Sequence, residues 1–156
     1  MMTVIVTGAG FDPWQELQAY QQAAQGLAGQ VGATSVFVGT MRDFNEGSGV
    51  QAMTLEHYPG MTEKQLAAIV AEAGRQWQVL DALIIHRVGE LLPNDPIVLV
   101  AVWTSHRGDA FDACRYIMEA LKSKAPFWKK ERLLSADERW VGKNTDGYHR
   151  APVIEK

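Results

Sequence analysis

The sequence predicts one α+β domain with antiparallel strand neighbours. Strand-like and helix-like segments follow the order βαββαββα, and short turn-rich stretches join consecutive strands. This order argues against a doubly wound dinucleotide fold, and from the pattern alone a ferredoxin-like βαββαβ core is the first expectation. With 156 residues, 47% of them hydrophobic, the chain can bury one core but is too short for two full domains.

The first elements are a strand, a helix and a pair of strands. Residues 3–8 (TVIVTG) predict a short strand, and residues 11–23 predict a helix that Asp12 caps. Residues 32–42 and 50–58 are strand-like and flank the turn-rich stretch DFNEGSG. These two strands are therefore expected to form a β-hairpin.

The clearest helix covers residues 61–77. Thr62 and Gln65, three residues apart, have the spacing of a capping box at its start. An apolar stripe at helical spacing predicts which face packs on the core. The residues of this stripe are Leu66, Ile69, Val70, Ala73 and Trp77.

The second half of the chain begins with two more strands, at residues 82–91 and 97–105, joined by the turn PNDP. A third helix is expected from about Gly108 to Lys124, and Pro126 ends it.

The C-terminal part is expected to contain a short strand around ERWVG, at 138–142. Residues 1–142 then make a single domain, and residues 143–156 a mobile tail.

Composition narrows the functional classes. No apolar run approaches the roughly 18 residues of a membrane span, and the N-terminus lacks the pattern of a secretory leader, so a cytoplasmic protein is expected. Cys114 is the only cysteine, and the four histidines lack ligand spacing, so neither a disulfide nor a metal site is expected. Cys114 itself lies among apolar helix positions, which indicates an inert core thiol. His57 and His86 fit packed, hydrogen-bonded strand residues better than catalytic ones.

Charge is unevenly distributed along the chain. Residues 1–104 hold four Lys or Arg against ten acids, whereas residues 105–156 hold eleven against eight, for a net charge of −3. This basic excess favours a small phosphate-bearing ligand or an acidic partner near the C-terminal third, and it is too small for nucleic-acid binding.

One candidate anion site is Ser105–Asp109, where a strand ends and a helix begins. Free backbone N–H groups and the helix dipole favour an anion there, and His106 and Arg107 add donors. The alternative, an ordinary helix start with two exposed polar residues, fits the pattern equally well.

The second candidate is LKSKAPFWKKE, at 121–131, which places two pairs of lysines around Phe127 and Trp128. Cations at a helix C-terminus complement its dipole, but this accounts for two lysines at most. A walled pocket with inward-facing lysines explains the aromatic residues as well. Desolvation and like charge would lower a lysine pKa in such a pocket and make a neutral amine available near pH 7. The four lysines are Lys122, Lys124, Lys129 and Lys130.

Several separated motifs resemble one family, the large subunit of molybdopterin synthase of the MoaE type. The resemblance runs from about Gly32 to Val141. The motifs are TLEHYPGMTEK, HRVGEL, TSHR, LKSKAPFWKKE and RW. It implies an α/β-hammerhead fold with an additional antiparallel sheet. It also implies a sulfurtransferase that converts cyclic pyranopterin monophosphate to molybdopterin. The sulfur comes from the thiocarboxylated Gly-Gly C-terminus of a small ubiquitin-like subunit of the MoaD type.

The resemblance also implies roles for individual residues. Lys122 and Lys129 match the family's catalytic lysines, with Lys122 beside the incoming thiocarboxylate tail. Arg42, His106 and Arg107 match positions that bind the pterin phosphate. Further substrate-binding positions, carried over from their neighbourhood or charge, are Thr40, Met41, Lys130, Glu131 and Arg139. The family often carries a basic residue where this chain has Thr40.

Helix geometry bears on assembly. If the third helix is continuous, His106 and Lys122 lie sixteen residues apart, or roughly 24 Å at 1.5 Å per residue. One small substrate cannot bridge that distance. A homodimer is therefore expected, in which His106 and Arg107 of one subunit complete the pocket of the other. The family resemblance implies that two small subunits join such a dimer in a heterotetramer.

One alternative of a different class remains. The chain could be a noncatalytic module that binds a ubiquitin-like tail or an anionic metabolite, with its lysines acting only through charge.

Overall fold

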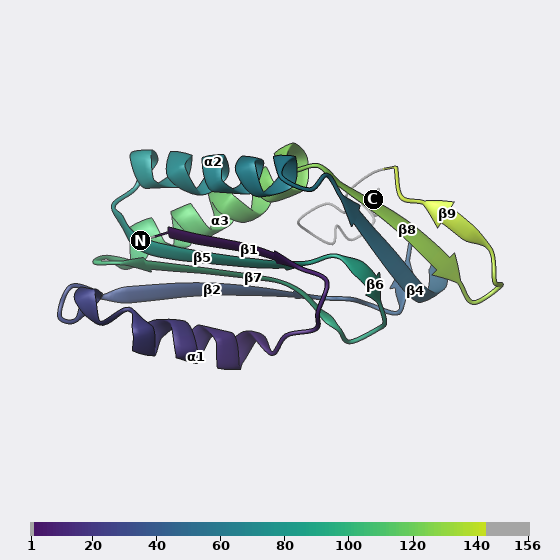
Figure 1. Ribbon diagram of the computed structural model, residues 1–156, viewed down its shortest axis with the longest axis horizontal. Coiled ribbons are helices and arrows are strands. Elements are labelled where there is room, and N and C mark those ends of the chain that lie inside the picture. The colour runs from purple at the N-terminus through teal and green to yellow at the C-terminus, as the bar shows by residue number, and fades with distance from the viewer. Residues whose placement is uncertain (1, 143–156) are drawn as a thin grey trace, which may run out of the picture.

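The computed structural model describes residues 2–142, and its centre is a four-stranded sheet (Figure 1). The strand order is β1 (Met2–Thr7), β5 (Val79–Arg87), β7 (Pro96–Thr104) and β2 (Ala33–Thr40). The pair β1–β5 is parallel and the other two pairs are antiparallel. The central strands β5 and β7 are mostly apolar and mostly buried, as expected for a sheet that is covered on both faces.

Three helices cover this sheet. α2 (Met61–Gln76) and α3 (Arg107–Lys124) lie on one face, and α1 (Pro13–Ala23) lies on the other (Figure 1). A short 3-10 helix, Gln25–Leu27, follows α1. The core under α2 and α3 contains the stripe expected from the sequence, with Leu66, Ile69, Val70 and Ala73 buried and Trp77 partly buried.

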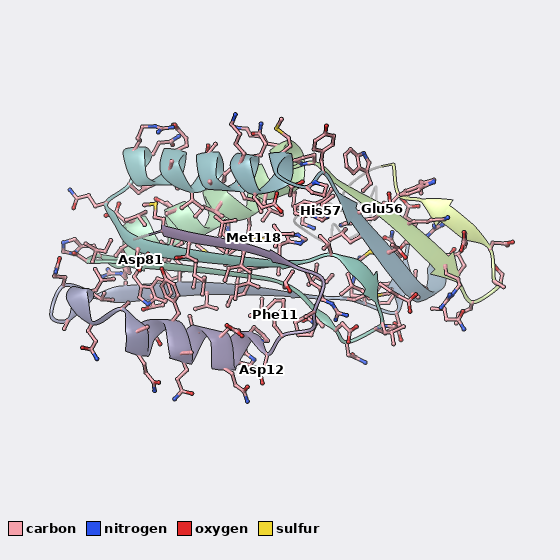
Figure 2. All side chains as sticks on the ribbon, in the orientation of Figure 1. Phe11, Asp12, Glu56, His57, Asp81 and Met118 are labelled. Carbon is pink, nitrogen blue, oxygen red and sulfur yellow. The ribbon has the colours of Figure 1, made fainter. Side chains whose placement is uncertain are left out.

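The caps of the first two helices have different chemistry. Asp12 caps α1 as expected, and its carboxylate accepts from the N–H groups of Trp14 and Gln15 at 2.9 and 3.2 Å (Figure 2). The capping box expected from Thr62 and Gln65 is wrong. The chain enters α2 through Gly60, whose positive φ of 83° suits glycine, and the carboxylate of Glu63 accepts from the Gly60 N–H at 2.6 Å. Thr62 is therefore free to turn inward.

A second, antiparallel sheet adjoins the first (Figure 1). Its order is β3 (Phe44–Asn45), β4 (Ser48–His57), β8 (Phe127–Leu133) and β9 (Glu138–Trp140), and β6 (Gly89–Leu91) also pairs with β4. A smaller core lies beneath this sheet, formed by Met41, Val50, Met53, Leu55, Val88 and Leu91. This is the additional antiparallel sheet that the family resemblance implied.

The hairpin expected between residues 32–42 and 50–58 is wrong. β2 pairs with β7 in the first sheet, whereas β4 pairs with the two-residue strand β3 and with β8 in the second. The chain crosses from the first sheet to the second just after Met41, whose main chain is hydrogen-bonded to the turn between β6 and β7. The Met41 N–H donates to the Asp95 carbonyl, and the Met41 carbonyl accepts from the Asn94 N–H, both at 2.9 Å. The turn-rich stretch therefore carries the chain from one sheet to the other.

Other departures from expectation are local. The strand expected at residues 82–91 divides at Val88 into β5 and β6, and Gly89 has a positive φ of 87°. The segment after Pro126 is the seven-residue strand β8, which the sequence pattern did not indicate. The pattern-based ferredoxin-like core also differs, because β1 and β2 are edge strands here and α1 covers the face opposite α2 and α3. The tail expected at residues 143–156 lies outside the described residues.

Candidate active site

A cavity of about 400 Å³ lies where the two sheets meet the end of α3. Its walls come from β2, β3, β4, β5, β7 and β8, from the crossing segment 41–43 between β2 and β3, and from the last turns of α3. Strand β2 ends, β8 begins and α3 ends beside the cavity. The site therefore depends on the way the two sheets are joined and not on one local motif.

Two lysines of the LKSKAPFWKKE stretch line this cavity. Lys122 occupies the last full turn of α3, and Lys129 is the third residue of β8, opposite Leu55 of β4. Ala125 and Pro126 turn the chain back between them, and the positive charge of Lys122 acts on Lys129. A helix end and a strand start thus bring two amines into one cavity.

The surroundings of Lys129 lower its pKa from the ordinary 10.5 to about 8. Burial is the largest cause, followed by the positive charge of Lys122, and Arg42 acts in the same direction. The carboxylate of Glu131 opposes these effects. Near neutral pH the Lys129 amine can therefore both give up and take a proton.

Glu131 is the buried carboxylate of the site, with 5% of its surface exposed. Its Oε1 accepts from Asn45 Nδ2 at 3.2 Å and from Arg139 Nε at 3.1 Å. Arg139 also donates to the Asn45 carbonyl and lies 3.9 Å from a carboxylate oxygen of Glu46. The guanidinium of Arg139 thus joins β9, β8 and β3, and it is not among the residues that line the cavity.

The crossing segment supplies the cationic rim of the cavity. Thr40, Met41 and Arg42 all line it, with Met41 buried and Arg42 exposed. The Arg42 guanidinium lies 4.8 Å from the centroid of the Phe44 ring, an arrangement that favours a cation over an aromatic face.

Lys124, Trp128 and Lys130 of the same stretch lie outside the cavity. Strand alternation puts Lys130 on the outer face of β8, where it pairs with Glu138 at 2.8 Å and lies over the ring of Trp140. Lys124 lies on the exposed side of α3, 5.8 Å from the Tyr116 ring centroid. Trp128 is 49% exposed, so Phe127 alone of the two aromatic residues lines the cavity. Of the four lysines, Lys122 and Lys129 therefore line the cavity, and Lys124 and Lys130 lie outside it.

His106 and Arg107 lie at the far end of α3. His106 is the N-cap residue, Arg107 begins the helix, and the helix continues without a break to Lys124. Both side chains are exposed and neither lines the cavity. The separation expected from the sequence, roughly 24 Å along the axis, therefore applies within one chain.

The comparison with known proteins decides the family. The model of the family described as MoaE protein matches residues 12–124. The chain belongs to the MoaE family. The molybdopterin synthase catalytic subunit of Ralstonia nicotianae is 55% identical over 141 residues, 90% of this chain and 77% of that one. The subunit of the same name from Pseudomonas aeruginosa is 51% identical over 140 residues, 90% of both.

Solved MoaE structures have the same architecture. The MoaE protein of Burkholderia ambifaria superposes with a TM-score of 0.75 at 50% identity, covering 94% of both chains. Molybdopterin synthase from Staphylococcus aureus gives 0.76 at 31% identity, covering 90% of this chain and 96% of that one. The fold implied by the family resemblance, an α/β hammerhead with an additional antiparallel sheet, is thus confirmed.

One cavity residue of this MoaE chain was not among the site residues expected from the sequence. His86 ends the buried run of β5, with 4% of its surface exposed, and lines the cavity. It is packed and hydrogen-bonded, as its strand position predicted. The available signal was the HRVGEL motif, in which a histidine takes an inward strand position otherwise filled by apolar residues.

The thiol of Cys114 is in the inert core position expected from the sequence. Cys114 is buried, and burial raises the pKa of its thiol. Among residues 2–142, no cluster of three or more His, Cys, Asp or Glu is placed to hold a metal ion. Within the same residues, no helix is both long and apolar enough to cross a membrane.

Proposed function

We propose that this chain is the catalytic subunit of a molybdopterin synthase, a sulfurtransferase of molybdenum cofactor biosynthesis. Its substrates would be cyclic pyranopterin monophosphate and the thiocarboxylated C-terminus of a small ubiquitin-like subunit of the MoaD type. The observation that carries the proposal is the pair Lys122 and Lys129, whose side chains line one cavity of a MoaE-family chain. The relatives named above are called molybdopterin synthase catalytic subunits.

The cavity suits a reaction in which sulfur is delivered from outside. The chain's only thiol, Cys114, is a buried residue of α3 and its raised pKa disfavours the thiolate, so it is a poor sulfur carrier. A thiocarboxylate tail is extended and anionic, and the cavity offers it cationic side chains. Its sulfur would bond to a substrate carbon as a carbon–oxygen bond of that carbon breaks, with the oxygen leaving as water or on the phosphate. Water would then cleave the acyl–sulfur bond and leave a carboxylate on the tail. Two such transfers complete the dithiolene.

The position of each side chain suggests its role. Lys122, at the helix end, is placed to meet the incoming tail and to stabilise negative charge on it. Lys129, with its lowered pKa, is suited to proton transfer. Arg42 would hold the phosphate, with Thr40 and Met41 shaping the wall beside it. Lys130 and Arg139 face other partners, so in this chain we assign both to supporting contacts.

We also infer a homodimer with shared sites, inside a heterotetramer with two small subunits. His106 and Arg107 are exposed at the start of α3, while the cavity lies at its end. They can reach a bound pterin phosphate only from a second copy of the chain. The catalytic domain is proposed to span residues 1–142, followed by a tail at 143–156, and the enzyme is proposed to act in the cytoplasm.

A Lys122→Arg variant separates catalysis from simple binding. Arginine keeps the positive charge but stays protonated at any working pH, so an enzyme that needs a deprotonatable or compact amine should lose turnover. We expect at least a tenfold fall in dithiolene formation in a reconstituted reaction, with tail binding retained. If the wild-type protein binds the thiocarboxylated subunit and makes no product, the chain is a noncatalytic binding module.

A further inference from the structure

Glu131 is the only carboxylate among the described residues that line the cavity, and the protein holds just one of its two oxygens. Oε1 accepts from Asn45 Nδ2 at 3.2 Å and from Arg139 Nε at 3.1 Å. Within residues 2–142, no group donates a hydrogen bond to Oε2. An open acceptor is unusual on a residue with 5% of its surface exposed, because buried polar atoms are nearly always paired. Oε2 is therefore available to a ligand in the cavity.

The contacts around Oε1 also fix the direction of the carboxylate. Glu131 lies opposite Arg139 in the β8–β9 pair, and Asn45 belongs to the short strand β3. Arg139 Nη2 donates to the Asn45 carbonyl at 3.0 Å, so the guanidinium binds both other members of the group. Rotation of the carboxylate would break two hydrogen bonds at once. Asn45 and Arg139 thus hold Oε2 in one direction.

The other charged side chains of the cavity are cations. Lys129 lies two residues before Glu131 on the same face of β8, and both line the cavity. Lys122 comes from α3 and Arg42 from the crossing segment. The cavity therefore combines cationic side chains with one anionic acceptor. An anionic group of a ligand is attracted to the first and repelled by the second.

The proposed pterin substrate has the same division of chemistry. Its phosphate is anionic, whereas its pyrimidinone ring carries an amino group at C2 that donates hydrogen bonds. The thiocarboxylate of the tail has no donor and is repelled by Glu131. A buried carboxylate is costly when it lacks a donor, so the amino group is the part of the substrate that suits Oε2.

We propose that Glu131 is the residue that recognises the pterin ring: its Oε2 accepts a hydrogen bond from the 2-amino group, and Asn45 and Arg139 are positioning residues that hold the carboxylate in place. A ring bound at Glu131 leaves the phosphate to face Arg42. The inference deepens the proposed function and rests on it, since it specifies how one end of the substrate is selected.

Two probes that differ at this amino group test the contact. 6-Hydroxymethylpterin has the 2-amino group, and 6-hydroxymethyllumazine has a carbonyl oxygen in its place. We expect wild type to bind the pterin about tenfold or more tighter than the lumazine in fluorescence titrations. In Glu131→Gln the amide oxygen can keep the bonds to Asn45 and Arg139, which places an NH₂ donor where Oε2 was. The preference should then disappear or reverse. No preference in wild type, or the same preference in the Gln variant, would overturn the proposal.

Inorganic phosphate is a third probe, and it separates recognition from a structural role. Its affinity for Glu131→Gln should stay close to that of wild type or rise, because a negative charge has been removed. A joint loss of phosphate and pterin binding would mean that Glu131 only maintains the shape of the cavity. Glu138→Gln is the matched control, because Glu138 pairs with Lys130 outside the cavity, and this variant should keep the pterin preference.

Asn45→Ala tests the positioning of the carboxylate. It removes one donor to Oε1 and leaves the Asn45 carbonyl for Arg139. The preference for the pterin over the lumazine should fall about threefold, because the carboxylate is held less firmly. An unchanged preference would contradict the positioning role.

The titrations also keep two failures apart, because they need neither the small subunit nor sulfur transfer. If wild type makes no dithiolene in the reconstituted reaction, the proposed function fails, and the titrations still decide whether Glu131 recognises the amino group. If wild type is active and its pterin preference does not depend on Glu131, the inference alone fails.

Discussion

The lowered pKa of the Lys129 amine follows from the position of this residue on strand β8. A lysine on the outer face of the same strand, Lys130, makes an ion pair with Glu138 in solvent. Lys129, one position earlier, points into the cavity, where most of the charged groups that act on its amine are positive. Adjacent lysines of one strand thus acquire opposite environments from pleat alternation alone.

This difference predicts a pH dependence of turnover. The pKa of Lys129 is lowered to about 8, and a neutral amine is the form that can accept a proton. Turnover should therefore rise as pH increases through about 8 and level off above it. In Lys129→Arg the rate should fall and the inflection should vanish, because the guanidinium does not titrate there. A reconstituted rate profile measures both, with Lys130→Arg as the matched control; an inflection that survives in Lys129→Arg would assign it to another group.

At the residue scale the sequence predicted several side chains that line the cavity, but not which of the predicted residues lie together. Lys122, Lys129 and Arg42 were expected at the site and do line the cavity. Lys130 and Arg139 were expected from charge and neighbourhood, yet the pleat and the Glu131 contact turn them to other partners. Inward and outward lysines can be told apart only when the strand register is known, and the sequence pattern did not predict β8.

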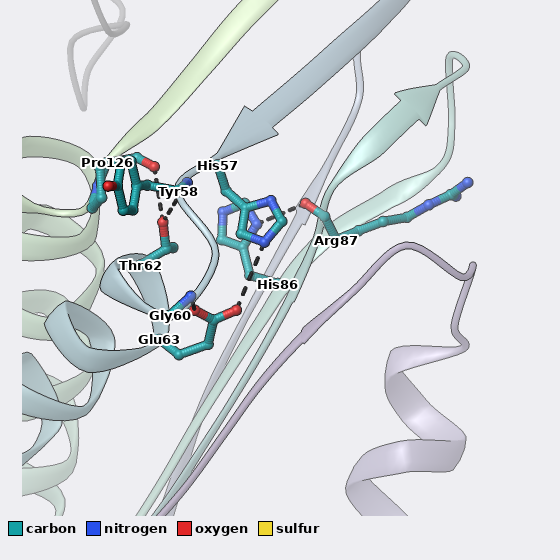
Figure 3. A network of polar contacts seen from close by, with 8 residues as sticks. All are labelled: His57, Tyr58, Gly60, Thr62, Glu63, His86, Arg87 and Pro126. Carbon is teal, nitrogen blue, oxygen red and sulfur yellow. Dashed lines mark hydrogen bonds and ion pairs between the residues drawn. The ribbon is translucent and has the colours of Figure 1, made fainter.

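At the element scale, one buried threonine connects the start of α2 to the joint between α3 and β8. Thr62 is 0% exposed; its hydroxyl accepts from the Tyr58 N–H at 3.0 Å and donates to the Pro126 carbonyl at 3.1 Å (Figure 3). Pro126 lies between the two cavity lysines in the chain. The hydroxyl therefore helps to fix the spacing between Lys122 and Lys129.

Removing this hydroxyl should weaken both the fold and the site. Thr62→Val keeps the shape of the side chain but leaves a buried donor and a buried acceptor without a partner. We expect the free energy of unfolding to fall by about 1–3 kcal/mol in urea titrations, with reduced turnover. Thr62→Ser restores the hydroxyl and should recover most of both. If Val matches wild type in stability and rate, the connection is unimportant.

The close approach of the backbone at Gly32 to that at Ser105, beside the β2–β7 pair, allows a second prediction at the element scale. A Cβ added at Gly32 would lie 2.1 Å from the Ser105 carbonyl oxygen, and the Gly32 N–H donates to the Thr104 carbonyl at 2.9 Å. Gly32→Ala must push two backbones apart just before His106, so thermal unfolding should show a loss of about 1–3 kcal/mol. Gly26→Ala is the control, because a Cβ there has no neighbour within 4 Å. Equal stability of the two variants would contradict the close approach.

Element prediction succeeded where periodicity was local and failed where pairing was long-range. The three helices and the strands at residues 2–7, 33–40 and 96–104 follow from apolar pattern and caps. The wrong hairpin had good turn residues, but the crossing at Met41 is decided by backbone hydrogen bonds to Asn94 and Asp95, some fifty residues away. Local turn chemistry cannot reveal such a partner.

At the scale of the whole molecule, the proposed site requires two chains. α3 is continuous, so one subunit cannot bring His106 and Lys122 to the same small substrate. Helix length alone indicated this from the sequence. The sheet arrangement that forms the cavity could not be anticipated in the same way, because it depends on β4 and β8 pairing across the chain.

Mixed dimers test the shared site. In a dimer of one His106→Ala and one Lys122→Ala chain, one of the two composite sites is intact and the other has lost both residues. If each variant is inactive alone, co-refolding equal amounts should restore about a quarter of the wild-type sites at random assembly. Activity no higher than the sum of the separate variants would mean that both residues act within one chain.

The most direct test of the central claim, that the Lys122 and Lys129 cavity performs the sulfur transfer, is a single-turnover measurement. Dithiolene product is quantified after mixing the chain with thiocarboxylated small subunit and cyclic pyranopterin monophosphate, for wild type, Lys122→Ala and Lys124→Ala. Lys124 lies two residues away on the same helix but outside the cavity. We predict product from wild type and from Lys124→Ala, and a loss of at least a hundredfold for Lys122→Ala. Equal product from both variants would contradict the account.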